Sequence, residues 1–167
     1  IRRLVTGSDD DLDAKLPPVL TPEEIIESRV LEPARILAEE YGSSVMISGG
    51  VSMPGNQNYF YLGIYDMMTA LKFEPELVHR LVGHSRRMIL NLLPAMKEAG
   101  IGCVWLEDNF VAGDLISRGD YETFFFEANA EIIEAAKREG LLTVYYLTGD
   151  VMSRIPHILE LNPDCLA

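Results

Sequence analysis

Apolar and polar positions along the chain follow two periods, which predict helices and strands in turn. In four segments the apolar residues recur every three or four positions, as they do on the buried face of a helix. These segments are 21–41, 59–71, 74–98 and 117–140. Short continuous apolar runs lie between them and indicate buried strands, at 43–48, 101–106 and 141–147. A short helix at 151–161 and the start of a fourth strand at Cys165 complete the order.

Capping residues mark the beginnings of two of these helices. Thr21 precedes Pro22, which suits the first position of a helix, and Glu24 completes a capping box with Thr21. Ser117 and Asp120 provide a second N-terminal cap. Glycine follows the expected end of three helices, as it commonly does, at Gly42, Gly100 and Gly140.

The order of strands and helices predicts an α/β fold with a parallel sheet built from βα units. A doubly wound sheet and part of a (β/α)₈ TIM barrel both fit this order. A complete barrel needs about 250 residues, so a chain of 167 residues holds about half of one. We expect residues 1–20 to form an extended arm and residues 21–167 to form the incomplete barrel domain. Because the chain starts with Ile1 and stops where a strand begins, we expect a fragment of a longer protein.

Composition and charge disfavour several classes of protein. Apolar residues make up 48% and charged residues 24%, which is the balance of a folded globular protein rather than a disordered one. The net charge of −12 disfavours binding to nucleic acid, because an acidic surface repels phosphate backbones. No apolar run reaches the roughly 18 residues that a membrane span needs. Two cysteines are too few for a disulfide framework and favour a cytoplasmic location.

Polar residues and glycines follow each predicted strand. These strand ends are Ser48-Gly49-Gly50, Glu107-Asp108-Asn109 and Thr148-Gly149-Asp150. Functional sites of parallel α/β folds gather at the carboxyl ends of the strands, because these ends meet at one edge of the sheet. We therefore expect the three strand ends to form one site.

Strand alternation sorts the candidate residues of this site by face. Side chains two positions apart point the same way, so Glu107 and Asp108 point in opposite directions and only one of them faces the mouth of the site. Tyr146 and Thr148 share a face and are the polar pair expected at the mouth. Asp150 precedes a helix, and its alternative role is the N-cap of that helix. Glu107 and Asp108 are the candidate catalytic residues, and the other three are candidate substrate-binding residues.

Metal-binding and nucleophile motifs have little support. His79 and His84 are five positions apart, which does not place them on one helix face, so we interpret them as solvated side chains. Cys103 and Cys165 are expected to be buried as small apolar groups. Ser52 lies in a segment without the second glycine of a nucleophile elbow, and we do not take it as a nucleophile.

Several short motifs follow one another in a particular order within residues 43–167. They are Tyr61-Leu62-Gly63, Glu74-Pro75-Glu76-Leu77-Val78, Ala99-Gly100, Glu107-Asp108, Asp114-Leu115-Ile116-Ser117, Gly140 and Thr148-Gly149-Asp150. This set resembles the uroporphyrinogen decarboxylase superfamily, which includes cobalamin-linked methyltransferases. The resemblance implies a TIM barrel of which this chain supplies the middle, about four strands. It also implies a site at the barrel mouth for a tetrapyrrole, a corrinoid or a one-carbon substrate.

Two branches of that superfamily differ in their chemistry. Its methyltransferases carry a His-x-Cys pair that binds zinc and activates a thiol, and Tyr146 and Thr148 stand at those positions here. The resemblance therefore implies a site without the zinc pair. Its decarboxylases use a tyrosine in the loop after an early strand, and Tyr61 is the nearest match, which makes it a candidate substrate-binding residue.

Three hypotheses about function remain open. The first is corrinoid-linked methyl transfer without the zinc pair, in which Glu107 or Asp108 acts as a general acid or orients the substrate. The second is cofactor-independent decarboxylation of uroporphyrinogen, which needs cations near the strand ends, where Arg118 and Arg154 are the nearest. The third is a non-catalytic half-barrel that binds a partner or has a structural role.

Each hypothesis carries expectations about ligands and partners. We expect no cofactor held by this segment alone, and a corrinoid that arrives as a substrate or on a partner protein. The substrate is expected to be a small molecule or a tetrapyrrole, whose identity the sequence leaves open. Exposed strand edges of a half-barrel predict self-association into a homo-oligomer.

Overall fold

Four parallel strands form a single sheet in the order β1-β2-β3-β4. The computed structural model describes Leu12 and residues 14–167, so most of the expected arm over 1–20 lies outside the described residues. The strands are β1 (Ser48–Ser52), β2 (Cys103–Glu107), β3 (Leu142–Tyr146) and β4 (Cys165–Leu166). Each crossover between them contains helix, which confirms the predicted parallel sheet of βα units.

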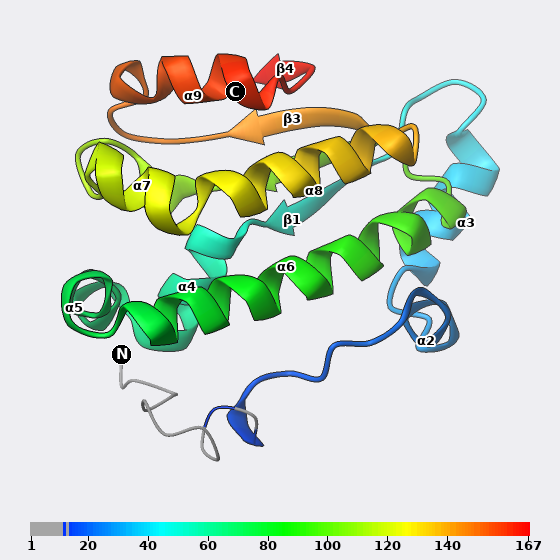
Figure 1. Cartoon of the computed structure of the whole chain (residues 1–167). Coiled ribbons are helices and arrows are strands. Elements are labelled where there is room, and N and C mark those ends of the chain that lie inside the picture. Colours follow the sequence, from blue (N-terminus) through cyan, green and yellow to red (C-terminus); the bar gives the residue numbers. More distant parts are fainter. Residues whose placement is uncertain (1–11, 13) are drawn as a thin grey trace.

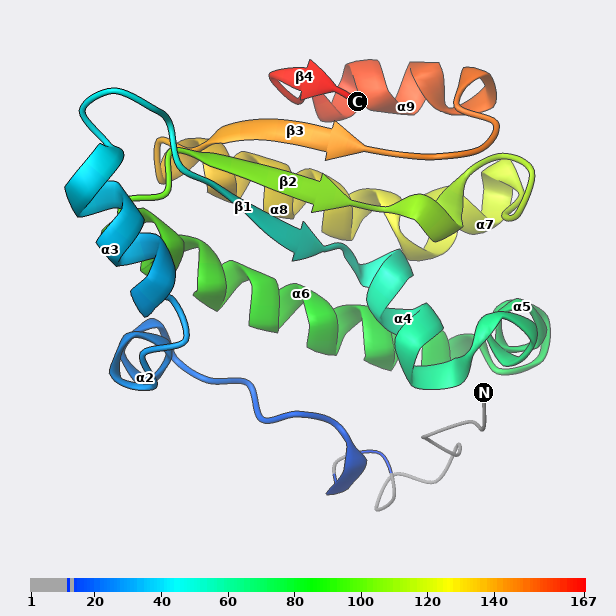
Figure 2. The same ribbon diagram turned by 180° about the vertical axis from the view of Figure 1, so that it is seen from behind.

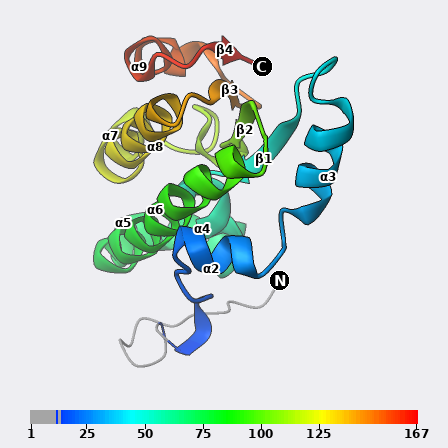
Figure 3. The same cartoon turned by 90° about the vertical axis from the view of Figure 1, so that its right-hand side faces the viewer.

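Helices cover one face of this sheet (Figure 1). Three helices follow β1: α4 (Pro54–Leu62), α5 (Ile64–Phe73) and α6 (Pro75–Glu98). The short turn η1 (Asn109–Val111) and the helices α7 (Arg118–Phe124) and α8 (Phe126–Arg138) follow β2. The turn η2 (Met152–Arg154) and α9 (Ile155–Leu161) follow β3. Figure 3 shows α5 to α8 on one side of the strands, and Figure 2 shows the opposite face with no described helix across it.

Two helices precede the sheet, where the pattern predicts a single one over 21–41. They are α2 (Pro22–Glu27) and α3 (Glu32–Tyr41). The chain breaks between them because Arg29 has a positive φ of 60° and Pro33 cannot continue a preceding helix. The capping box is confirmed: the Glu24 side chain accepts from the Thr21 N–H at 2.8 Å, and Thr21 Oγ1 accepts from the Glu24 N–H.

Three further predicted boundaries were wrong. The first strand runs over 48–52 rather than 43–48, so Ser48-Gly49-Gly50 begins the strand instead of following it. The helix predicted over 59–71 starts at Pro54 and is divided at Gly63, whose φ of 81° interrupts helical geometry. The helix predicted over 117–140 has its cap at Ser117 as expected but is divided at Phe125. The apolar periodicity continues through each break, whereas the helical conformation of the backbone is interrupted there.

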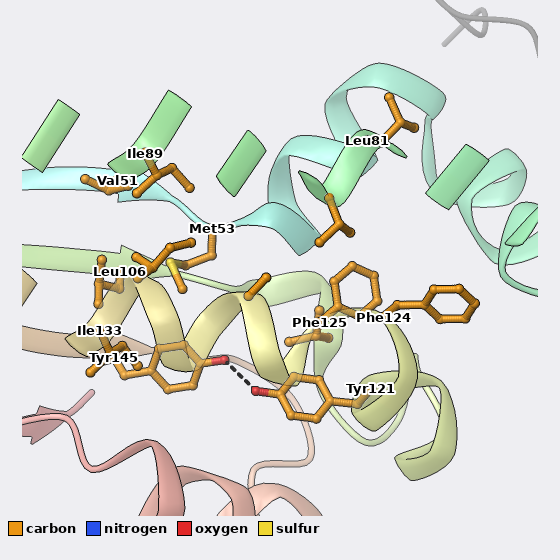
Figure 4. Packing of buried hydrophobic residues seen from close by; sticks show 14 of the residues in the cluster. Val51, Met53, Leu81, Ile89, Leu106, Tyr121, Phe124, Phe125, Ile133 and Tyr145 are labelled. Carbon is orange, nitrogen blue, oxygen red and sulfur yellow. Dashed lines mark hydrogen bonds between the residues drawn. The ribbon is translucent and has the colours of Figure 1, made fainter. Parts of the chain in front are cut away.

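The core lies between the covered face of the sheet and the helices α6 and α8. Val51, Leu106 and Tyr145 point into it from the three long strands, and each is at most 3% exposed. Ile89 of α6 and Ile133 of α8 meet them from the helix layer (Figure 4). No helix among the described residues is long and apolar enough to cross a membrane.

Candidate functional site

Three polar side chains form one row across the sheet at its carboxyl edge. Ser52 of β1 pairs in register with Glu107 of β2, and Glu107 pairs with Tyr146 of β3. Residues paired in this way between parallel strands point to the same face. Since Val51, Leu106 and Tyr145 point into the core, this row lies on the opposite side, which we call the uncovered face.

Aromatic rings lie beside this row on the uncovered face. Trp105 is two residues before Glu107 and remains 38% exposed. Its ring lies 5.9 Å from the ring of Tyr146, centroid to centroid. Gly50 pairs with Trp105, and a Cβ on Gly50 would lie 3.4 Å from Oε1 of Glu107, so the carboxylate extends over this glycine. The uncovered face thus offers a carboxylate, a phenol and an indole within one small area.

Asp108 lies on the covered face, on the opposite side from Glu107. Its side chain is fully buried, at 0% exposure. Two backbone hydrogen bonds hold this end of the sheet: the Asp108 N–H donates to the Tyr146 carbonyl and the Met53 N–H donates to the Glu107 carbonyl, each at 2.9 Å. Of the two acids, Glu107 is the one that a ligand on the uncovered face can reach.

A chain of hydrogen bonds connects Tyr61 to the end of β1. The Tyr61 hydroxyl donates to the Gln57 side chain at 3.3 Å, and the Gln57 amide donates to the Ser52 carbonyl at 2.9 Å. Burial raises the pKa of the half-buried Tyr61 phenol. Tyr61 therefore reaches the row of Ser52, Glu107 and Tyr146 through Gln57 and not by its own side chain.

The loop after β3 is exposed at both predicted site residues. Thr148 follows the strand and its side chain is open to solvent. Asp150 accepts from the Ser153 N–H at 3.4 Å, but Val151 and not Asp150 is the N-cap of η2. The Asp150 N–H in turn donates to Asp114 of the loop after β2 at 3.1 Å, so these two loops meet at the carboxyl edge.

A pocket opens beside β1 and includes one end of the polar row. Its volume is about 240 Å³. The polar lining consists of Ser52 and Gln57, and most of the remaining lining is apolar, from α2, α6 and the segment before α2. Such a lining, largely apolar with a few polar groups, is typical of small-molecule sites.

A buried polar cluster behind the sheet was not predicted. Oδ2 of Asp108 accepts from the Tyr145 hydroxyl at 2.7 Å and from the Asn129 amide at 2.6 Å. The Tyr121 hydroxyl lies 3.4 Å from that of Tyr145, as Figure 4 shows. One sequence signal was available: Asn129 occupies a helix position in line with the buried Ile132 and Ile133, where an apolar residue is expected.

Burial shifts the pKa values of this cluster upwards. The pKa of Asp108 rises from 3.8 to about 7 because burial opposes its charge more than the Tyr145 and Asn129 hydrogen bonds favour it. Burial and the Asp108 charge raise the pKa of Tyr121 to about 12, and the pKa of Tyr145 rises for the same reasons. Near neutral pH the two phenols are therefore uncharged, whereas Asp108 is close to the midpoint between its charged and uncharged forms.

The methyltransferase pattern, to which the sequence has a resemblance, includes a zinc site whose positions can be located here. The positions of its histidine and cysteine hold Tyr146 and Thr148, whose oxygens are poor zinc ligands at neutral pH. Cys103 is buried near the other end of β2, and Cys165 is exposed on β4. Within the described part of the chain, no three His, Cys, Asp or Glu side chains lie close enough to hold a metal ion.

Comparisons with known proteins agree with this architecture. A family model described as uroporphyrinogen decarboxylase (URO-D) matches residues 5–167. A search of curated proteins gave no match. Among solved structures, a methyltransferase from Methanosarcina mazei superposes with a TM-score of 0.74 at 20% identity, over 82% of this chain and 40% of that one. This likeness supports the expected fold, part of a barrel of βα units, and this chain spans 40% of the methyltransferase's length.

Proposed function

The chain belongs to the uroporphyrinogen decarboxylase family, and from this premise we propose that its protein transfers a methyl group between a small substrate and a corrinoid. One observation carries the proposal: Ser52, Glu107 and Tyr146 stand in one row on the uncovered face at the carboxyl edge of the sheet. That edge is where enzymes built on βα barrels hold their substrates. The similar fold of a methyltransferase favours this activity within the family.

Glu107 has the central role in this proposal. Its carboxyl group faces the uncovered side, where it can orient the substrate. It can also donate a proton to the heteroatom that loses the methyl group, or accept the proton of a thiol, amine or alcohol that receives the methyl group in the reverse direction. Tyr146 supplies a phenolic hydrogen-bond donor beside it. Trp105 and Tyr146 provide an aromatic surface against which an apolar part of the substrate can pack.

Zinc has no part in the proposed reaction, because Tyr146 and Thr148 do not fit the metal. The corrinoid would supply the cobalt centre that carries the methyl group, as a free substrate or on a partner protein. This chain's contribution is to bind and orient the small substrate. The pocket beside Ser52 and Gln57 offers an apolar surface for the part of the substrate that does not react.

Decarboxylation of uroporphyrinogen is the alternative, and the positions of two arginines weigh against it. A substrate with many carboxylates needs cations at the strand ends. Arg154 is buried and donates to the backbone carbonyls of Val111, Ile116 and Ser117. Arg118 pairs with Glu122 on α7 at 2.8 Å. Both arginines considered from the sequence are therefore engaged away from the uncovered face.

The test follows methyl transfer from methylcobalamin to small thiol, amine and alcohol acceptors by the visible absorption of the corrinoid, with the complete protein. We expect turnover, and we expect Glu107→Gln to lower it by about 100-fold or more with little change in stability. Glu127→Gln, an exposed carboxyl on α8, is the matched control and should keep the native rate.

Three other outcomes would redirect the assignment. Consumption of uroporphyrinogen without methyl transfer would favour the decarboxylase alternative. Full methyl-transfer activity in Glu107→Gln would remove Glu107 from the proposed role. The absence of both activities in the complete protein would favour a binding or structural subunit.

A further inference from the structure

Asp108 connects several elements of the fold, and the proposed methyl transfer gives this buried residue no role. Its carboxyl group lies at the end of β2 and contacts β3 through Tyr145 and α8 through Asn129. We propose that Asp108 is a positioning residue whose protonation state controls how the first turn of α4 and the end of β3 pack against β2, and so where Glu107 and Tyr146 stand.

The surroundings of Asp108 suit an uncharged carboxyl group. Three elements place groups against it: β3 contributes the Tyr145 hydroxyl, α8 the neutral amide of Asn129 and α4 the backbone at Gly55. The Tyr121 hydroxyl of α7 contacts Tyr145 and Asn129 behind them. All of these groups are uncharged near neutral pH. An ionised carboxylate here would have only these dipoles as direct partners, and burial of a charge without a paired cation is unfavourable.

Among the described residues, Arg154 is the cation that acts on Asp108, and its hydrogen bonds go to backbone carbonyls and not to the carboxyl group. The guanidinium of Arg154 lies 4.8 Å from the ring centroid of Tyr121 and donates to the carbonyls of Val111 and Ile116. It acts on Asp108 by its charge at a distance, and the pKa of Asp108 still rises to about 7. The charge balance around Asp108 therefore changes within the ordinary range of cellular pH.

Close packing leaves the ionised form no room to gain water. Oδ1 of Asp108 accepts no full hydrogen bond from any described residue, and it faces the first turn of α4. A Cβ on Gly55 would lie only 2.6 Å from that oxygen and 2.3 Å from Val111. The Gly55 backbone N–H favours the charged form of Asp108, so the protonation state of the carboxyl changes how strongly Oδ1 attracts the first turn of α4.

Backbone hydrogen bonds transmit a change in the position of this turn to the uncovered face. The Met53 N–H, just before α4, donates to the Glu107 carbonyl, and the Asp108 N–H donates to the Tyr146 carbonyl. Glu107 directly precedes the buried Asp108, and Tyr146 directly follows the buried Tyr145. The change in packing does not depend on the proposed function. Only the consequence of this change for substrate binding rests on the proposed function.

Trp105 gives a direct readout, because it is the single tryptophan of the chain and lies beside Tyr146 on the uncovered face. The experiment records Trp105 fluorescence of the full chain from about pH 5 to about pH 9, without any substrate. We expect a transition with its midpoint near the Asp108 pKa of about 7. Asp108→Asn should abolish it, whereas Glu107→Gln should retain it.

A second variant keeps the test decisive where Asp108→Asn does not fold. The Tyr145 hydroxyl favours the charged form of Asp108, so Tyr145→Phe should move the midpoint to higher pH. A purely structural role would not move the midpoint in this direction. A flat native curve, a transition that persists in Asp108→Asn, or an unmoved midpoint in Tyr145→Phe would overturn the proposal. Because no substrate is present, failure of the methyl-transfer assay leaves this result unaffected.

Discussion

The Tyr145 hydroxyl donates to Asp108 Oδ2 over 2.7 Å, and both residues are buried, with at most 1% of either exposed. These two residues come from neighbouring strands, 37 positions apart in the sequence. Their contact joins the end of β2 to β3 behind the row that holds Glu107 and Tyr146. The stability of this end of the sheet therefore depends on the charge of a single buried carboxyl group.

Stability should fall as pH rises from about 4 to about 7. The Asp108 carboxyl has a pKa of 3.8 when unfolded and about 7 when folded, so in this interval the folded state holds a proton that the unfolded state has lost. Below the interval both states are protonated, and above it both are ionised. The loss amounts to about 4 kcal/mol at most. Urea unfolding at a series of pH values measures this loss of unfolding free energy. Asp108→Asn should remove the part of the pH dependence that lies between about pH 4 and about pH 7.

Replacing Gly55 by alanine should destabilise the protein by about 1 to 3 kcal/mol, because the added Cβ overlaps Val111 and Asp108. Gly119→Ala is the matched control, since nothing lies within 4 Å of a Cβ at that helical position. The control should be neutral or up to about 1 kcal/mol more stable. Equal unfolding midpoints for the two variants would contradict the close packing at Gly55.

Asp164 should stabilise the β3–β4 end of the sheet at neutral pH but not in acid. Its carboxylate accepts from the Thr143 N–H and hydroxyl, each at 2.8 Å, and these bonds lower its pKa below 3.8. A lowered pKa means that the contribution is present above the unfolded value and is lost as pH falls through the folded one. Asp164→Asn should cost about 1 kcal/mol at pH 7. Thermal unfolding near pH 3 should show a smaller difference in unfolding temperature between Asp164→Asn and the native chain than at pH 7.

Tyr146→Phe tests the phenol on the uncovered face separately from the fold. The substitution keeps the ring beside Trp105 and removes the hydroxyl alone. If the phenol donates to the substrate, kcat/KM in the methyl-transfer assay should fall about fivefold to tenfold, the value of one hydrogen bond. The unfolding free energy should stay within about 0.5 kcal/mol of the native chain. An unchanged kcat/KM would remove Tyr146 from the substrate-binding residues.

Periodicity and capping signals located most elements but not their breaks. The long helix α6 follows its predicted range almost residue for residue, because Pro75 starts it and Ala99-Gly100 ends it. The breaks at Arg29 and Gly63 lie inside segments whose apolar spacing continues without interruption. The spacing of apolar residues indicates which side chains become buried. The direction of the backbone at a break depends on what the helices on either side of the break pack against.

The amino-acid sequence by itself determined the parallel βα architecture and the opposite directions of Glu107 and Asp108. Alternation along a strand requires that opposition. Only the tertiary structure decided which acid faces the uncovered side, because that depends on where α6 and α8 lie. It also assembled Asp108, Asn129 and Tyr145, whose contacts span 21 and 37 positions. No local pattern encodes such contacts, since they arise when separate elements bury their apolar faces together.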